Sequence, residues 1–240
     1  MKAELSVAAL YRLLKQLDLG EPHPLFTGGE RYYSPRFQQE ADAEFRAALT
    51  AAGVAGRDGL DHGFVELLTV MQRGQVEYYG WLHDAEGPYS VLTAAAGRVG
   101  VLAERIGDTV TVEPVEAARL LDAFLYRLPS TPPARGEALS VRVQDLADGD
   151  GFGRRLPPPA RRLEALLKTE RTGGGKLYTA RRDPRGRRVR ATAWVDVIDV
   201  AAGRWALYRV AGRGEPFVTA VPGTTQVIGK RLAELQSGLH

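Results

Sequence analysis

The sequence predicts an α+β fold with an antiparallel sheet, and three of its features support this class. Apolar residues recur at helical spacing near the N-terminus, the hydrophobic period changes to two residues from Gln75 onward, and a similar order of elements returns in the second half of the chain. At 240 residues the chain has room for one large domain or two small ones. A chain of this length buries enough surface to form a core without disulfides or a metal.

The first part of the chain is predicted to be helical. Five leucines form one stripe over residues 5–17, which predicts an amphipathic helix entered through a short strand at Lys2–Ser6. Gly20 and Pro22 are expected to end this helix. An ordered loop and two further helices are expected next, at Glu21–Arg36, about 36–51 and about 61–72.

Alternating side chains predict an antiparallel meander in the middle of the chain. Its strands are expected from Gln75 and at Tyr89–Ala95, Arg98–Ile106 and Thr109–Glu113. Turn residues separate them at Asp84–Pro88, Gly97 and Gly107-Asp108. Pro114 is expected to open a helix that ends before Pro129, with Ala118, Leu121, Phe124, Leu125 and Leu128 on its apolar face.

The second half is predicted to repeat this plan. A short strand is expected at Ala138–Val143, a helix near Pro159–Thr169, and a turn at Gly173–Gly175. The strands that follow are predicted at Lys176–Arg182, Val189–Val200, Arg204–Ala211 and Pro216–Val221, and Pro222 is expected to open the last helix, which runs to Leu235.

Matching positions in the two halves suggest an internal repeat. Gly175, Gly203 and Pro222 occupy the places that Gly74, Gly97 and Pro114 occupy in the first half. We therefore expect one domain of two pseudo-repeated halves, about 1–130 and 131–240, with a quasi-twofold arrangement that merges both meanders into one sheet. Two unrelated α+β halves with similar turns are the alternative.

The composition excludes several kinds of site. The chain has no cysteine, which rules out disulfides, thiolate metal sites and cysteine nucleophiles. The histidines at 23, 62, 83 and 240 lack metal-binding spacing, and the glycine-rich stretches Asp148–Gly153 and Gly173–Lys176 lack the residues of a calcium or phosphate loop, so both are interpreted as flexible turns. We expect no enzyme, metal or cofactor. A weak enzyme alternative would need a pocket around His83 or Asp148–Asp150.

The N-terminal sequence and the hydropathy predict a cytoplasmic protein. No segment approaches the roughly 18 consecutive apolar residues of a membrane span. The first residues include Glu4 and soon become helical in pattern, so they lack the apolar core of a secretory signal.

Basic residues are concentrated in one segment. The chain has a formal net charge of only +3, but residues 154–190 hold thirteen basic and three acidic side chains. The richest part, Arg181–Arg190, is a candidate for binding nucleic acid or another anionic surface. The alternative is a solvated hairpin that turns at Asp183–Gly186 and whose arginines keep an edge soluble.

An aromatic cluster on the first meander strand is a candidate for protein binding. Alternation places Tyr79 and Trp81 on one face of the strand and Tyr78 on the other. Exposed tyrosine and tryptophan are typical of protein-binding surfaces. Burial of the same residues under a helix is the alternative.

Several segments together resemble the EspG family, chaperones associated with actinobacterial type VII (ESX) secretion. They are Glu4–Leu10, Val76–Leu82, Ala96–Ala103, Gly107–Pro114, Gly203–Arg209 and Val221-Pro222. The resemblance implies a central antiparallel sheet flanked by helical bundles with quasi-twofold symmetry. It also implies a cytosolic chaperone, without enzymatic activity, that binds PE/PPE-like or WXG-type secreted proteins and keeps them soluble.

The resemblance further implies where the partner binds. Carried onto this sequence, the binding residues are Tyr79 and Trp81 on the strand, the loop formed by Asp84, Ala85, Glu86, Gly87 and Pro88, and the helix residues Leu163, Leu166 and Leu167.

Overall fold

The computed structural model describes residues 2–32, 34–147, 156–210 and 215–239, and these form two compact units. Unit 1 comprises Met1–Trp81, Pro88–Arg127 and Ala180–Val189. Unit 2 comprises Leu82–Gly87, Leu128–Thr179 and Arg190–His240. Each unit therefore contains a short segment from the half of the chain that mainly forms the other unit: Ala180–Val189 in unit 1 and Leu82–Gly87 in unit 2.

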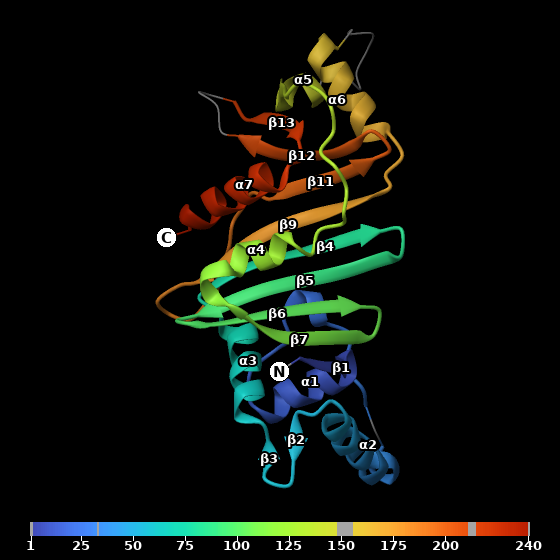
Figure 1. The fold of residues 1–240 in the computed structure, drawn as a ribbon, viewed down its shortest axis with the longest axis vertical. Helices are drawn as coiled ribbons and strands as arrows, with labels where there is room; N and C mark the ends of the chain where they lie inside the picture. The colour runs from blue at the N-terminus through green and yellow to red at the C-terminus, as the bar shows by residue number, and fades with distance from the viewer. Residues whose placement is uncertain (1, 33, 148–155, 211–214, 240) are drawn as a thin grey trace. The chain divides into compact units, whose positions relative to one another are not determined.

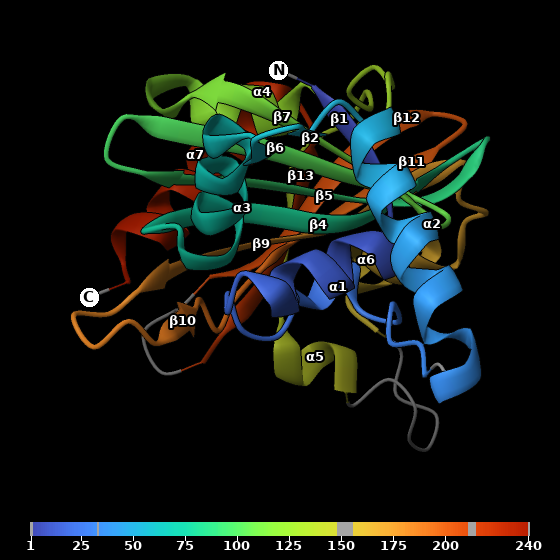
Figure 2. The same cartoon turned by 90° about the horizontal axis from the view of Figure 1, so that it is seen from below.

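Unit 1 is built on antiparallel strands with helices on both faces (Figure 1). Its strands are β1 (Ala3–Ser6), β4 (Val76–Asp84), β5 (Gly87–Ala96), β6 (Val99–Ile106) and β7 (Thr109–Glu116), in the order β1-β7-β6-β5-β4, with a separate small hairpin of β2 (Ala55–Gly56) and β3 (Gly59–Leu60). Its helices are α1 (Val7–Gln16), α2 (Gln38–Ala51), α3 (His62–Arg73) and α4 (Leu120–Leu125), with short 3₁₀ turns at Pro24–Phe26, Pro35–Phe37 and Ala117–Arg119. Figure 2 shows α1 and α4 on opposite sides of the strands.

Two helices of unit 1, α1 and α3, begin at residues whose side chains cap them. The Ser6 hydroxyl accepts a hydrogen bond from the Ala9 amide at 3.1 Å, and the leucine stripe of α1 is buried. Asp61 caps α3 in the same way, accepting from the Phe64 amide at 2.7 Å. The predicted helices at 5–17, 36–51 and 61–72 are confirmed, and the short strand before α1 is present as β1.

Unit 2 repeats the same kind of construction. Its strands are β8 (Leu139–Arg142), β9 (Gly173–Arg182), β11 (Val195–Val200), β12 (Gly203–Val210) and β13 (Phe217–Pro222), in the order β9-β11-β12-β13-β8. The end of β9 and most of β10 (Arg188–Arg190), which pairs with β9, belong to the segment Ala180–Val189 of unit 1. Its helices are α5 (Val143–Ala147), α6 (Pro158–Lys168) and α7 (Thr225–Ser237). Leucines and valines of β8, α6 and β11 to β13 share one buried core.

The two units share a pairing pattern. In unit 1 the edge strand β1 pairs antiparallel with β7, the last strand of its meander. In unit 2 β8 pairs antiparallel with β13, again the last strand, and a helix directly follows each edge strand. This matched topology favours the predicted internal repeat, which stays a prediction. The antiparallel α+β class itself is confirmed.

Two prolines expected to open helices lie within strands instead. Pro114 pairs with Val101 in the ladder between β6 and β7, and it lies beyond the part of β7 that β1 covers, which ends at Val112. Pro222 is the last residue of β13, and Thr224 rather than Pro222 caps α7. Proline is tolerated at a sheet edge or strand end because its missing amide hydrogen is not needed there.

Two further predictions about the second half are wrong in detail. The glycines Gly173–Gly175 are not a turn but the first residues of β9, where each pairs with β11. The strand predicted over Val189–Val200 is interrupted after Arg190, so that β10 and β11 are separate strands that both pair with β9. The predicted turn at Asp148–Gly153 lies outside the described residues.

Candidate partner-binding surface

Strand β4 exposes one aromatic side chain and buries its neighbours. Trp81 is 41% exposed, whereas Tyr79 is only 1% exposed although it lies two residues away on the same side of the strand. The two rings meet edge to face with centroids 5.8 Å apart. Tyr79 therefore supports Trp81 from beneath, and the expectation that both form an exposed pair is corrected.

Tyr79 is buried because two residues distant in the sequence, His23 and Arg188, pack against its ring. The His23 ring lies edge-on to Tyr79 at a centroid distance of 4.9 Å, and the Arg188 guanidinium lies over the Tyr79 ring at 4.6 Å. The loop before α2 and the segment around β10 thus cover the inner part of β4. Trp81 lies beyond them.

The predicted partner-binding loop is a tight hairpin between β4 and β5. Asp84 accepts a hydrogen bond from the Glu86 amide at 2.8 Å, the geometry of a side-chain-stabilised turn. Gly87 adopts φ +126°, which favours glycine, and Ala85, Glu86 and Pro88 are exposed. The hairpin presents a small tip on which Glu86 is the exposed charged side chain.

The three predicted leucines of helix α6 differ in how far they are buried. Leu163 is fully buried in the core of unit 2, and Leu166 packs against the same core while partly exposed. Leu167 is 41% exposed. Among the three predicted leucines, only Leu167 offers a large apolar surface, and Leu163 has a structural role.

The candidate surface is thus narrower than the predicted set. The structure brings Tyr79 and Trp81 together in unit 1, and Leu163 and Leu166 together in the core of unit 2. Trp81, the hairpin tip and Leu167 are the members that a partner can reach.

The arginine segment forms the hairpin that the sequence predicts. The Gly186 amide donates to the Asp183 carbonyl at 2.8 Å, and the Asp183 amide donates to the Arg187 carbonyl at 2.9 Å. The Arg187 backbone amide also donates to the Asp183 carboxylate, which with the Arg187 guanidinium lowers the pKa of Asp183. The turn at Asp183–Gly186 is confirmed.

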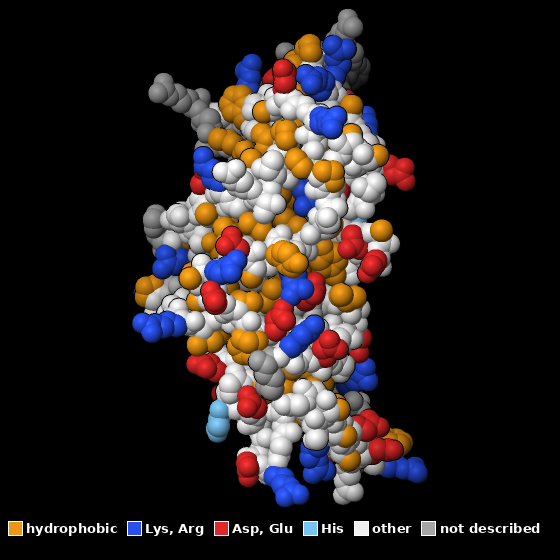
Figure 3. All heavy atoms as spheres, in the orientation of Figure 1, with side chains coloured by type: hydrophobic (Ala, Val, Ile, Leu, Met, Phe, Trp, Pro, Cys, Tyr) orange, Lys and Arg blue, Asp and Glu red, His pale blue; other side chains and the backbone are white. Residues whose placement is uncertain are grey.

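Several of these arginines are already engaged within the protein. Arg188 binds Glu77, Arg182 donates to the Gln72 carbonyl, and Arg190 lies over the Tyr178 ring at 5.1 Å. Figure 3 shows basic and acidic side chains interspersed on the face it displays. Internal use of the guanidinium groups favours the solvated-hairpin interpretation over a dedicated anionic-ligand surface.

A buried polar cluster beside Tyr79 is the main feature that sequence reasoning missed. Glu77 is fully buried, and its Oε2 lies 2.6 Å from Nε of Arg188 and 3.7 Å from Nε2 of His23. The only signal in the sequence is an acidic residue at an inward strand position, which demands a partner but does not identify one. Both partners are distant along the chain.

Electrostatics within this cluster follow from burial and from the neighbouring charges. Burial lowers the pKa of His23, and the positive charge of Arg188 lowers it further against the opposing effect of Glu77. Burial would raise the pKa of Glu77, but its interactions with His23 and Arg188 outweigh that effect and hold the pKa below its ordinary value. Glu77 is therefore a carboxylate and His23 is neutral near pH 7.

A second buried ion pair organises unit 2. Arg204 donates to both carboxylate oxygens of Asp199, at 2.7 and 2.6 Å, and to the Pro129 carbonyl at 2.7 Å. Thr131 donates to the same carboxylate at 3.0 Å. The pair fixes the loop after α4 to the sheet of unit 2, which is a structural role.

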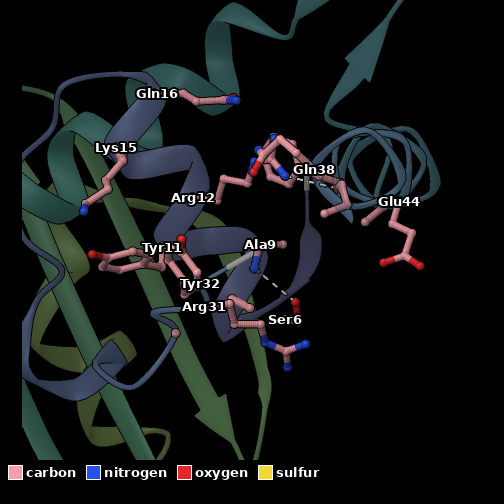
Figure 4. Close-up of a pocket in the computed structure, with 15 residues that line it drawn as sticks. Ser6, Ala9, Tyr11, Arg12, Lys15, Gln16, Arg31, Tyr32, Gln38 and Glu44 are labelled. Carbon is pink, nitrogen blue, oxygen red and sulfur yellow. Dashed lines mark hydrogen bonds between the residues drawn. The ribbon is translucent and has the colours of Figure 1, made fainter. Parts of the chain in front are cut away.

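Unit 1 also contains an open hollow between α1, α2 and the loop that precedes α2. It has a volume of about 680 Å³, and Tyr11, Lys15, Arg31 and Tyr32 are among the side chains around it (Figure 4). Lys15 lies over the Tyr11 ring at 4.9 Å. Tyr32 is 92% exposed.

Neither a metal site nor a membrane span is found in the described part of the chain. Among the described residues, no three histidine, cysteine or acidic side chains are grouped so that they could hold a metal ion. The helices that the structure describes are all too short or too polar to cross a membrane.

Comparisons with known proteins place the chain in a family. No curated protein matches it. Among solved structures, the Mycobacterium tuberculosis type VII secretion system chaperone EspG5, solved in complex with the PE25–PPE41 dimer, has a similar fold, with a TM-score of 0.74, 19% sequence identity, and coverage of 100% of this chain and 97% of EspG5. The model of the EspG family matches residues 6–234, and the chain therefore belongs to the EspG family.

Proposed function

We propose that this protein is a cytoplasmic chaperone of type VII secretion that binds a PE/PPE-like helical substrate and keeps it soluble before export. The observation that carries the proposal is membership of the EspG family over residues 6–234. The similarity of fold to EspG5, which is itself bound to a PE–PPE dimer, extends over the whole chain and supports the same role.

The exposed surface has the character that such binding needs. Trp81 is a large aromatic side chain in edge-to-face contact with Tyr79, and Leu167 is an exposed aliphatic side chain on α6. Interfaces favour aromatic anchors surrounded by polar groups, and the tip at Ala85-Glu86 supplies such groups. Shielding an apolar surface on a helical substrate would prevent its self-association. Binding and release make or break no covalent bond, so the role includes no catalytic step.

Co-expression with candidate substrates tests the proposal. Each PE/PPE-like or WXG-type pair of the source genome is produced together with the chaperone, and size exclusion with light scattering measures the mass of the product. We expect one pair to form a stoichiometric complex that survives high salt. Absence of any such complex across all pairs would contradict the function.

A point variant tests the surface. Because truncation of an aromatic hot spot costs about 2 kcal/mol or more, Trp81→Ala should weaken substrate binding at least about 30-fold. Tyr126→Ala is the matched control, since Tyr126 is an aromatic residue of the same unit that is 85% exposed. Equal affinities of the two variants, measured by calorimetry, would remove Trp81 from the binding surface.

A further inference from the structure

The buried cluster around His23 joins three segments of unit 1. His23 lies in the loop after α1, Glu77 on β4, and Arg188 on the returning arm of the arginine hairpin. Nη2 of Arg188 lies 2.8 Å from Nε2 of His23. His23 is itself held in place, because its backbone amide donates to Oε1 of Gln72 at 3.1 Å.

Both ring nitrogens of His23 face hydrogen-bond donors. The Leu25 amide points at Nδ1 at 3.3 Å, and the Arg188 guanidinium, which can only donate, faces Nε2 at 2.8 Å. A neutral imidazole can accept at one nitrogen only. The shorter, charge-assisted contact favours acceptance at Nε2, which leaves the proton on Nδ1.

A second proton on His23 would reverse this contact. The imidazolium has no acceptor, so it loses the bond from Arg188 and places a positive charge beside the guanidinium. Its Nε2–H would then turn toward Oε2 of Glu77, 3.7 Å away, which is the oxygen that Arg188 already binds at 2.6 Å. Two cations would compete for one carboxylate oxygen.

The charged groups that act on His23 in the described structure are one carboxylate and two guanidinium groups. Glu77 faces it from β4, Arg188 from β10 and Arg182 from β9, while Gln72 on the α3 side is uncharged. One buried carboxylate would therefore have to balance three cations. The weakest attachment is Arg188, because its side chain is 21% exposed and can move into water, whereas the side chain of His23 is 3% exposed.

We propose that His23 is a proton-operated latch that holds the arginine hairpin of Ala180–Val189 onto unit 1 when neutral and releases it when protonated. The hairpin comes from the half of the chain that otherwise builds unit 2, so the latch controls the attachment of an exchanged segment. Release leaves the hairpin turn itself intact, because its bonds from Gly186 and Arg187 to Asp183 do not involve His23.

The direction of the pH response follows from the lowered pKa of His23. The attached state binds fewer protons than the released state, so attachment is complete above the ordinary histidine pKa of about 6.5 and weakens as the pH falls below it. Between that value and the lowered pKa of His23, the equilibrium constant for release of the hairpin should rise about tenfold for each pH unit by which the pH falls. In the attached state Glu77 is a carboxylate, because its interactions with His23 and Arg188 hold its pKa below its ordinary value.

Hydrogen exchange of two neighbouring amides in the full chain tests the latch. The Arg182 amide donates to the Gln75 carbonyl at 3.3 Å and reports attachment to unit 1, whereas the Asp183 amide donates within the hairpin and reports the turn. Between about pH 7.5 and about pH 5, after correction for intrinsic exchange rates, the Arg182 amide should lose protection while the Asp183 amide and those of β12 keep theirs.

Variants separate the latch from general acid sensitivity. His23→Gln keeps an acceptor but cannot be protonated, so its Arg182 amide should show no pH dependence, while the exposed His62→Gln control behaves as wild type. Arg188→Met should leave the Arg182 amide weakly protected at every pH. The proposal is overturned if the wild-type Arg182 amide is equally protected at both pH values, if His23→Gln responds as wild type does, or if β12 loses protection in parallel.

Discussion

Replacement of Arg204 by methionine should destabilise unit 2 strongly. Asp199 is fully buried, and Arg204 supplies hydrogen bonds to both of its oxygens at 2.7 and 2.6 Å as well as one to Pro129. After the substitution only the Thr131 hydroxyl of these partners remains on the carboxylate, so the charge is buried without compensation. Removal of one partner of a buried ion pair costs about 3–5 kcal/mol.

Urea unfolding followed by circular dichroism measures this loss. Arg187→Met is the matched control, because the Arg187 side chain is 71% exposed in its ion pair with Asp183, and such pairs contribute about 0–1 kcal/mol. The double variant Asp199→Leu/Arg204→Met should recover part of the loss, since it leaves no buried charge. A loss for Arg204→Met no larger than that for Arg187→Met would refute the reasoning.

Two further substitutions, each with a control variant, test the packing of unit 2 by urea unfolding. Leu163→Ala should lower the free energy of unfolding by about 2–5 kcal/mol, because Leu163 is fully buried in the core. Leu167→Ala, on the exposed side of the same helix, should lower it by less than about 1 kcal/mol. Similar losses for the two variants would contradict the assignment of Leu163 to the core. Gly174→Ala should disrupt the start of β9, because Gly174 has φ +123° and a Cβ there would lie 2.1 Å from the Val197 carbonyl oxygen. The control Gly186→Ala, at φ +76° in open space, should cost only about 1 kcal/mol of unfolding free energy. Equal stability of both variants would show that β9 tolerates a side chain at position 174.

Local sequence patterns predicted those elements whose causes are local. The leucine stripe of α1 and the turn at Asp183–Gly186 act over a few residues, and the structure places both as expected. The α+β class and the family resemblance depend on such patterns summed along the chain, and both are confirmed.

Elements determined by distant partners could not be predicted in this way. Pro114 and Pro222 resemble helix-opening prolines, and only the pairing of β6 with β7 and of β12 with β13 shows that they belong to strands. The glycines before Lys176 resemble a flexible turn until β11 is placed against them.

The candidate surface shows the same division. Alternation along β4 correctly puts Tyr79 and Trp81 on one side, but exposure depends on His23 and Arg188, which cover Tyr79 and leave Trp81 accessible. The family resemblance likewise groups Leu163 with Leu167, but the core of unit 2 buries Leu163 and leaves Leu167 exposed.

Hydrogen exchange of the protein with and without a co-purified PE/PPE-like pair tests the central claim most directly. If the exposed surface binds the substrate, amides around Trp81, the hairpin at Asp84–Pro88 and α6 should gain protection in the complex, while those of α2 and α3 stay unchanged. Protection confined to other parts of the chain, or no change with the pair bound in stoichiometric amount, would contradict this account of the binding surface.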